Sequence, residues 1–223
     1  MRSLLLCVFV AVLLCSVWLP GAQQGPADVE WRYYSGDNAA RKYSPLAQIT
    51  KENVASLRIA WRRPHLDPSL LAVNPRLRPA NNFRSTPIMV GGVVYASNGI
   101  GLVEAFDPET GRTIWVQRVP EDELPVGNSN RGVAYWSQGD NGRILTFRNH
   151  YLYALDARTG APIAEFGLGG RVDLTAATGS SRAYSWNGTP LVVRDVVVLG
   201  SSMAEQDSAA RMTGTPGDVY AFD

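Results

Sequence analysis

The sequence predicts an all-β fold: a β-propeller built from four-stranded antiparallel blades, of which about three are present. A repeated phrase is the first observation behind this prediction. VEAFD at residues 103–107, with Thr-Gly following, returns 49 residues later as LYALD at 152–156, again followed by Thr-Gly. A third copy, VYAFD, occupies residues 219–223. Periods of this size are typical of solenoids, propellers and repeat arrays.

A second phrase repeats independently of the first. TPIMVGGVV at residues 86–94 returns as TPLVVRDVV at 189–197, 103 residues later and about two periods on. No amphipathic helix of ten or more residues is predicted between the strands, which argues against a parallel α/β sheet. An immunoglobulin-like sandwich also holds many short strands. Sandwiches do not repeat their sequence, so the propeller is favoured.

Residues 1–22 are predicted to be a cleaved export signal, and residues 23–223 the propeller domain. A short basic start precedes an apolar run at residues 4–19, and small residues follow up to Ala22. The sixteen apolar residues are fewer than the roughly twenty that span a bilayer. A retained membrane anchor is the alternative.

Removal of that signal changes the charge and the cysteine count. Arg2, Cys7 and Cys15 leave together, so the mature chain has 20 basic against 20 acidic residues and no thiol. A disulfide or a thiolate metal site is therefore not expected. A neutral chain also gives no reason to expect a nucleic-acid partner.

The segment before the repeats has weaker signals. A short helical piece is predicted at residues 51–57 with Thr50 as its cap, and a strand at 57–61. Residues 62–83 contain four prolines and no hydrophobic period, so they are predicted to be a loop.

The first repeat contains four predicted strands joined by recognisable turns. Gly91 and Gly92 form a two-residue hairpin turn, because glycine supplies the positive φ that such turns need. Residues 107–111 form a longer turn, in which Asp107 opens the turn and Gly111 takes the left-handed position. The strands are expected at residues 88–90, 93–97, 102–106 and 112–119.

The later repeats follow the same pattern. The second unit is expected to have strands at residues 133–136, 143–148, 151–155 and 162–166. The third is expected at residues 191–193, 196–200 and 219–222. The acidic run at 121–123 between the first two units is interpreted as a solvated loop.

The start of each first strand carries a polar side chain. Arg84, Arg131 and Asn187 hold comparable positions in the three units, and equivalent positions in successive blades lie at the same end of the central channel. Two guanidinium groups and an amide around one axis suit a ligand with several carboxylates. The alternative is that each side chain only ties its strand to a neighbouring loop.

Three segments resemble a known family in combination: an opening at residues 31–61, Asn-Arg-Gly at 130–132, and GSSMAE at 200–205. They are similar to the pyrroloquinoline-quinone (PQQ)-dependent dehydrogenases, the quinoprotein alcohol and glucose dehydrogenases. The resemblance covers residues 31–223. It implies an eight-bladed propeller with the quinone and a Ca²⁺ ion at the channel mouth. The part of the family seen here is its N-terminal part, so we expect a longer protein.

The resemblance also implies roles for particular residues. Arg131 matches the arginine that contacts the quinone oxygens, and Asn187 falls where a hydroxyl residue commonly touches the cofactor. Glu205 matches a carboxylate that binds Ca²⁺, which polarises a quinone carbonyl as a Lewis acid. The cofactor-binding candidates are therefore Arg84, Arg131, Asn187, Ser202, Met203 and Ala204, with Glu205 as the metal ligand.

This sequence departs from the family pattern in two places. Arg84 stands where many relatives have a glutamate, and Pro125 and Val126 replace an adjacent pair of cysteines. The family's general-base aspartate has no counterpart among these residues, so no catalytic base is assigned.

The predicted function is an exported, periplasmic PQQ-dependent dehydrogenase, with membrane association left open. It would oxidise an alcohol or a sugar by hydride transfer to a Ca²⁺-activated quinone. Cytochrome c or ubiquinone would accept the electrons. The alternative is a non-enzymatic propeller scaffold of the bacterial envelope that carries the same repeat and binds no quinone.

Overall fold

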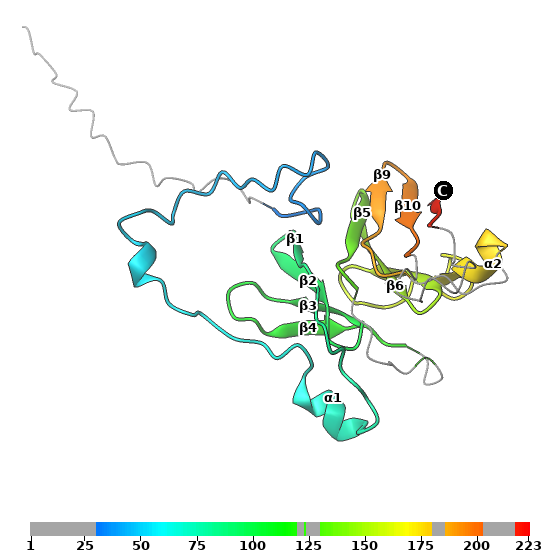
Figure 1. Cartoon of the computed structure of the whole chain (residues 1–223), viewed down its shortest axis with the longest axis horizontal. Helices are drawn as coiled ribbons and strands as arrows, with labels where there is room; N and C mark the ends of the chain where they lie inside the picture. Colours follow the sequence, from blue (N-terminus) through cyan, green and yellow to red (C-terminus); the bar gives the residue numbers. More distant parts are fainter. Residues whose placement is uncertain (1–29, 120–122, 124–129, 180–185, 203–216) are drawn as a thin grey trace, which may run out of the picture.

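Within the described residues the chain folds into three antiparallel sheets, as the sequence predicts (Figure 1). The computed structural model describes residues 30–119, 123, 130–179, 186–202 and 217–223. The first sheet runs β1-β2-β3-β4 in chain order, and the second runs β5-β6-β7-β8. The third has the order β11-β10-β9. The predicted signal at residues 1–22 lies outside the described residues.

The strand bounds agree with most of the predicted ones. In the first sheet they are β1 Ile88–Val90, β2 Val93–Ser97, β3 Val103–Phe106 and β4 Thr113–Val116. In the second sheet they are β5 Ala134–Gln138, β6 Asn141–Arg148, β7 Tyr151–Asp156 and β8 Arg171–Asp173. The third sheet contains β9 Leu191–Val193, β10 Val196–Gly200 and β11 Val219–Phe222.

The predicted turns have the geometry that their residues favour. Gly91 and Gly92 have φ of 58° and 72° between β1 and β2. In the longer turn, the Asp107 carboxylate accepts hydrogen bonds from the backbone N–H of Glu109 and Thr110, at 3.0 and 2.8 Å. Gly111 then adopts φ 68°, a conformation that disfavours residues with a Cβ. The Asp and Gly of the repeated phrase therefore specify a turn.

The core lies mainly between successive sheets, so the second sheet is covered on both faces. Ile144 on β6 packs into the cluster shared with the first sheet, whereas its neighbour Leu145 packs toward the third. Successive residues of a strand point to opposite faces. β6 can therefore contribute to both clusters, and its run of apolar residues reflects burial on both sides.

Two tryptophans dock on equivalent turns. The Trp61 indole N–H donates to the carbonyl of Pro108 at 2.9 Å, and the Trp115 indole N–H donates to that of Ala157 at 3.0 Å. Pro108 and Ala157 hold the same position in the two copies of the repeated turn. Trp61 therefore contacts the turn of the first sheet in the same way as Trp115 of β4 contacts the turn of the second sheet.

The predicted strand at residues 57–61 is wrong. This segment is extended but pairs with no strand among the described residues, and Leu57 and Ile59 are exposed. A run of apolar residues becomes a strand only where a neighbouring strand accepts its hydrogen bonds. The predicted helix at 51–57 is reduced to one 3₁₀ turn, η1 Val54–Ser56.

The region predicted to be a loop at residues 62–83 contains a short helix, α1 Pro68–Val73. Pro68 occupies its first turn, where proline is tolerated because the N–H there needs no helical partner. The Asp67 side chain caps the helix by accepting from the Ser69 N–H at 2.9 Å. Proline, taken as a breaker in the sequence, starts a helix here.

The predicted strand at residues 162–166 is also wrong. Only Pro162 makes a bridge, to Leu155, and β8 pairs with β7 instead. Proline has no N–H to continue a ladder. Helix α2 Leu174–Thr178 follows β8, and within the described residues no helix is long and apolar enough to cross a membrane.

Candidate functional site

The starts of the three first strands lie side by side. The Thr86 N–H donates to the Arg131 carbonyl at 2.8 Å, and the Arg131 N–H donates to the Asn187 carbonyl at 3.3 Å. Thr86 and Gly132 also form a parallel bridge. The segments that carry Arg84, Arg131 and Asn187 are therefore neighbours at one end of the sheets, which we call the site end.

Asn130 fixes the backbone next to Arg131. Its side chain is buried and donates to the Phe147 carbonyl and, at 3.4 Å, to the Thr146 hydroxyl. Its own carbonyl accepts from the Ser97 hydroxyl at 3.1 Å. The asparagine thus joins the first and second sheets, and it presents the exposed Arg131 side chain at a fixed place.

Gly132 allows three segments to approach closely. A Cβ at this position would lie 2.9 Å from the Thr189 hydroxyl oxygen and 3.2 Å from both the Thr86 carbonyl and a ring carbon of Tyr34. Such contacts leave no room for a side chain. In the Asn-Arg-Gly sequence, the asparagine therefore anchors the backbone, the arginine presents an exposed positive charge, and the glycine lets the neighbouring segments approach closely.

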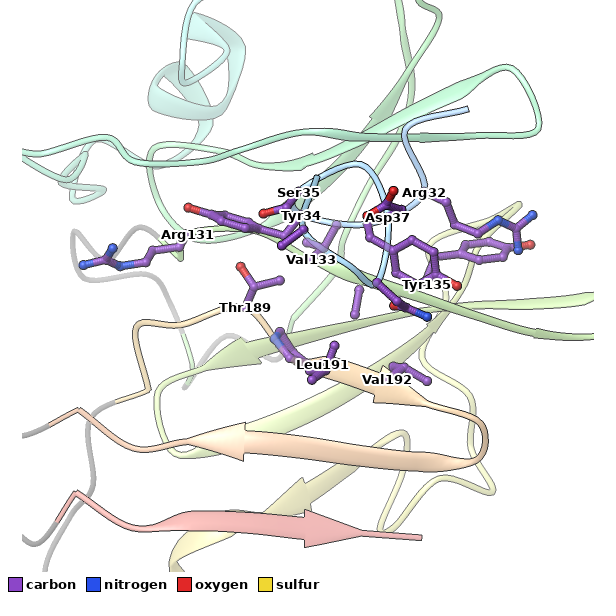
Figure 2. Close-up of a pocket in the computed structure, with 15 residues that line it drawn as sticks. Arg32, Tyr34, Ser35, Asp37, Arg131, Val133, Tyr135, Thr189, Leu191 and Val192 are labelled. Carbon is purple, nitrogen blue, oxygen red and sulfur yellow. The ribbon is translucent and has the colours of Figure 1, made fainter. Parts of the chain in front are cut away.

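A cavity of about 440 Å³ opens at the site end (Figure 2). Segment 32–40, which contains two turns, forms one wall, and the starts of β5 and β9 form the other. Its lining combines tyrosine rings, apolar side chains and a few charges. The lining residues are Arg32, Tyr33, Tyr34, Ser35, Asp37, Asn38, Ala40, Arg131, Val133, Ala134, Tyr135, Thr189, Pro190, Leu191 and Val192.

The charges of this cavity differ in their pairing. The Arg41 backbone N–H and side chain hold the pKa of the Asp37 carboxyl below its usual range, and the two side chains pair at 2.5 Å. The Arg32 guanidinium pairs with Glu30 at 3.1 Å and lies over the Tyr135 ring. Among the described residues, none accepts a hydrogen bond from the Arg131 guanidinium. Arg131 is therefore the cation of the cavity that is open to an anionic ligand.

Thr189 is a site residue that the sequence analysis did not identify. Its hydroxyl oxygen is buried, and no described residue forms a hydrogen bond with it. Figure 2 shows its side chain pointing toward Tyr34, at the end of the cavity where the Arg131 side chain extends outward. The Thr-Pro phrase shared with residues 86–87 marked this position, but only as part of the repeat.

None of the other predicted site residues that the structure describes lines the cavity. Arg84 is exposed and is not part of the cavity lining, and Asn187 contributes its backbone carbonyl. Ser202 is half-buried just after β10. Met203, Ala204 and Glu205 lie outside the described residues, as do Pro125 and Val126. The cavity therefore contains one of the predicted cofactor residues, Arg131.

The interpretation of the acidic run at residues 121–123 as a solvated loop is wrong for Glu123. Its carboxylate is buried, forms an ion pair with Arg171 and accepts a hydrogen bond from the Tyr153 hydroxyl. Its carbonyl accepts from the Arg148 side chain at 2.7 Å, and burial lowers the pKa of that guanidinium. Glu123 thus ties the connection between the first two sheets to the second sheet.

These contacts are not a metal site. Throughout the described part of the chain, no group of three or more His, Cys, Asp or Glu side chains could hold a metal ion.

The comparisons with known proteins agree with the sheet architecture. The sequence profile of the PQQ family, glucose/ethanol/alcohol dehydrogenase beta-propeller domain, matches residues 31–223. The chain belongs to this family. The family resemblance and the predicted β-propeller are therefore confirmed.

The relatives are dehydrogenases of alcohols. The dehydrogenase subunit of a quinone alcohol dehydrogenase from Komagataeibacter europaeus is 32% identical over 200 residues, covering 86% of this chain and 23% of the relative. A 1-butanol dehydrogenase (cytochrome c) from Thauera butanivorans is 29% identical over 201 residues, covering 87% of this chain and 24% of the relative. The chain thus spans about a quarter of the length of these relatives.

A solved structure is also similar to this chain over about a quarter of its own length. The quinohemoprotein alcohol dehydrogenase from Comamonas testosteroni superimposes with a TM-score of 0.60 at 26% identity. The match covers 78% of this chain and 23% of that chain.

Proposed function

We propose that the protein is a PQQ-dependent dehydrogenase that oxidises alcohols. Family membership and the names of the relatives support the reaction class. The observation that carries the proposal is the cavity at the site end, where the Arg131 guanidinium and the buried Thr189 hydroxyl have no partner among the described residues.

The residues present fit such a cofactor. PQQ is a flat aromatic quinone with carboxylates, and a guanidinium binds a carboxylate or quinone oxygen through charge-assisted hydrogen bonds. Tyr34 and Tyr135 offer ring faces to a flat ligand, while Val133 and Leu191 supply apolar walls. A cavity of about 440 Å³ is of the size that small ligands occupy. When bound, the quinone supplies the two-electron acceptor for alcohol oxidation.

The chain's own residues would hold and orient the cofactor. Asn130 and Gly132 fix the backbone on both sides of Arg131, so the guanidinium works from a rigid base. Val133 is fully buried and supplies an apolar part of the cavity wall. We include Ca²⁺ in the proposal, with Glu205 as its ligand, since calcium prefers carboxylate oxygens.

Substrate, acceptor and location complete the proposal. The relatives named above favour an alcohol over a sugar, and their names point to a quinone or cytochrome c as electron acceptor. Export by a cleaved signal at residues 1–22 would bring the protein to the periplasm. Mass spectrometry of the mature N-terminus tests that part.

Quinone binding is the test of the proposal. The protein, produced in its natural length and free of quinone, is titrated with PQQ in the presence of Ca²⁺. Arg131→Ala should weaken binding by about 1.5–3 kcal/mol, because a charge-assisted contact is lost. Arg158→Ala, an exposed arginine on the turn 156–160, is the control and should bind like wild type. A wild-type protein that binds no quinone would refute the enzyme and favour the scaffold.

The calcium part has a separate variant. Glu205→Gln removes one formal charge from the proposed ligand set, so reconstitution with PQQ should need a higher Ca²⁺ concentration. An unchanged Ca²⁺ requirement would remove Glu205 from the site.

A further inference from the structure

The Thr189 hydroxyl is buried without a partner in the described part of the chain. A buried hydroxyl that forms no hydrogen bond costs about 1–3 kcal/mol of stability. Native proteins rarely keep such a group unless a ligand, an ion or water satisfies it. The position therefore suggests a group that is satisfied only when the cavity is occupied.

The surroundings of this hydroxyl indicate which kind of ligand would form a hydrogen bond with it. Its oxygen and a Tyr34 ring carbon both lie against Gly132, within 2.9 and 3.2 Å of the point where a Cβ would stand. Arg131 precedes Gly132 in the chain. Figure 2 shows the Thr189, Tyr34 and Arg131 side chains at the same end of the cavity. A hydroxyl, an aromatic ring and a guanidinium from three separate segments thus meet at one place.

We propose that the Thr189 hydroxyl is a second hydrogen-bonding group for the quinone, which acts beside the Arg131 guanidinium. This inference rests on the proposed function. In the structure the hydroxyl oxygen is buried and its side chain points toward Tyr34 (Figure 2), so a quinone would reach it only after the neighbouring side chains shift. The hydroxyl would then donate to one of the quinone's oxygens.

The repeat supplies an internal comparison. Thr86 precedes a proline in the first sheet just as Thr189 does in the third, yet Thr86 is not part of the cavity lining. Its backbone N–H instead bonds to Arg131. The two threonines share a sequence phrase and differ in exposure to the cavity, which makes Thr86 a matched control.

The experiment measures two quantities on the quinone-free protein of natural length. One is its thermal midpoint, and the other is its dissociation constant for PQQ, from quenching of protein fluorescence. The variants are Thr189→Val, Thr189→Ser and, as control, Thr86→Val. Thr189→Val should unfold at the wild-type temperature or higher, because the swap removes an unsatisfied hydroxyl at nearly constant volume.

The same variant should bind PQQ about 5- to 20-fold more weakly, which corresponds to the loss of one hydrogen bond. Thr189→Ser keeps the hydroxyl and should stay within about twofold of wild type. Thr86→Val should leave quinone affinity unchanged. Stability that is kept or raised, together with weaker binding, is a combination that a purely structural threonine would not produce.

Three results would overturn the inference. A lower thermal midpoint of Thr189→Val would mean that the hydroxyl already has a structural partner. Wild-type quinone affinity of Thr189→Val would exclude a contact, and if Arg131→Ala still weakened binding, the proposed function would stand without Thr189. If wild type bound no PQQ, the inference and the proposed function would both fail.

Discussion

A buried tryptophan packs at each of the two junctions between neighbouring sheets, but the two tryptophans lie at different ends of the sheets. Between the first and second sheets, Trp115 of β4 lies on the turn 156–160, with Gly160 beneath its ring. The Ala157 carbonyl of that turn accepts from the Trp115 indole at 3.0 Å and from the Tyr95 hydroxyl at 3.2 Å. This turn follows the end of β7, so it lies opposite the site end.

Between the second and third sheets, Ala164 occupies the position that corresponds to Trp115. A cavity of about 210 Å³ lies at this junction, with Trp136, Phe166 and Phe222 among its walls. The buried tryptophan of this junction is Trp186, stacked on Phe147 with ring centroids 5.6 Å apart.

This difference concerns function as well as packing. Trp186 directly precedes Asn187 and lies three residues before Thr189, so its ring supports the backbone of the site end. The first junction is closed at the end away from the site, where loss of packing should affect stability alone. The second is closed next to the cavity, where a loss of packing should also weaken ligand binding. Mutations at the two junctions should therefore separate stability from quinone affinity.

The largest expected effect is the loss of the Trp115 ring. Trp115→Ala should lower the free energy of unfolding by about 3–5 kcal/mol, the range for large buried aromatic side chains. Quinone affinity should change little, because the contact lies away from the cavity. Denaturant unfolding of the quinone-free protein measures the first quantity, and PQQ titration the second.

Phe166→Ala is the matched control at the other junction. Phe166 is half-buried and lines an existing cavity, so its loss should cost less than that of Trp115. Equal losses for the two variants would contradict the distinction between the junctions.

An intermediate effect is expected at the glycine beneath the Trp115 ring. Gly160 and Gly139 both have positive φ, 71° and 57°. A Cβ at Gly160 would overlap the Trp115 ring, whereas a Cβ at Gly139 would meet nothing within 4 Å. Gly139→Ala should therefore cost about 1 kcal/mol from backbone strain alone, and Gly160→Ala clearly more. Similar thermal midpoints for the two variants would show that the ring does not press on the turn.

The smallest effect is a pH dependence in the equivalent turn that receives Trp61. Hydrogen bonds from the Thr110 side chain and backbone N–H lower the pKa of the Asp107 carboxyl below 3.8. A group with a lowered folded pKa stabilises above its unfolded pKa and loses that contribution as the pH falls through the folded value. The thermal midpoint of wild type should exceed that of Asp107→Asn near neutral pH, and the difference should shrink in acid below pH 3.8. A constant difference between pH 7 and pH 3 would exclude this carboxylate as its source.

The sequence predicted the parts of the fold that depend on local chemistry. Gly91 and Gly92 specify their hairpin within two residues, and the Asp107 side chain caps its turn within three, so these features are visible in the chain itself. The strand at 162–166 was wrong because a strand depends on its partner, and β8 supplies a better one than a segment that starts with proline.

The site was only partly predictable for the same reason. Arg131 could be found because it stands in a recognisable sequence at a repeated position. Glu123 could not, since its burial depends on Tyr153 and Arg171, 30 and 48 residues away. The repeated phrase marked the position of Thr189 but not its role, because a hydroxyl without a partner among the described residues is a property of the packed structure.

The central claim is that the site end of the sheets, and not the opposite end, binds the quinone. Hydrogen–deuterium exchange of the protein with and without PQQ tests it most directly. We expect added PQQ to slow exchange in peptides covering residues 130–133 and 186–192, where the Arg131 and Thr189 segments lie. The turn 156–160 under Trp115 should exchange at the same rate in both states. Slower exchange at that turn without any change at 130–133 would contradict the account.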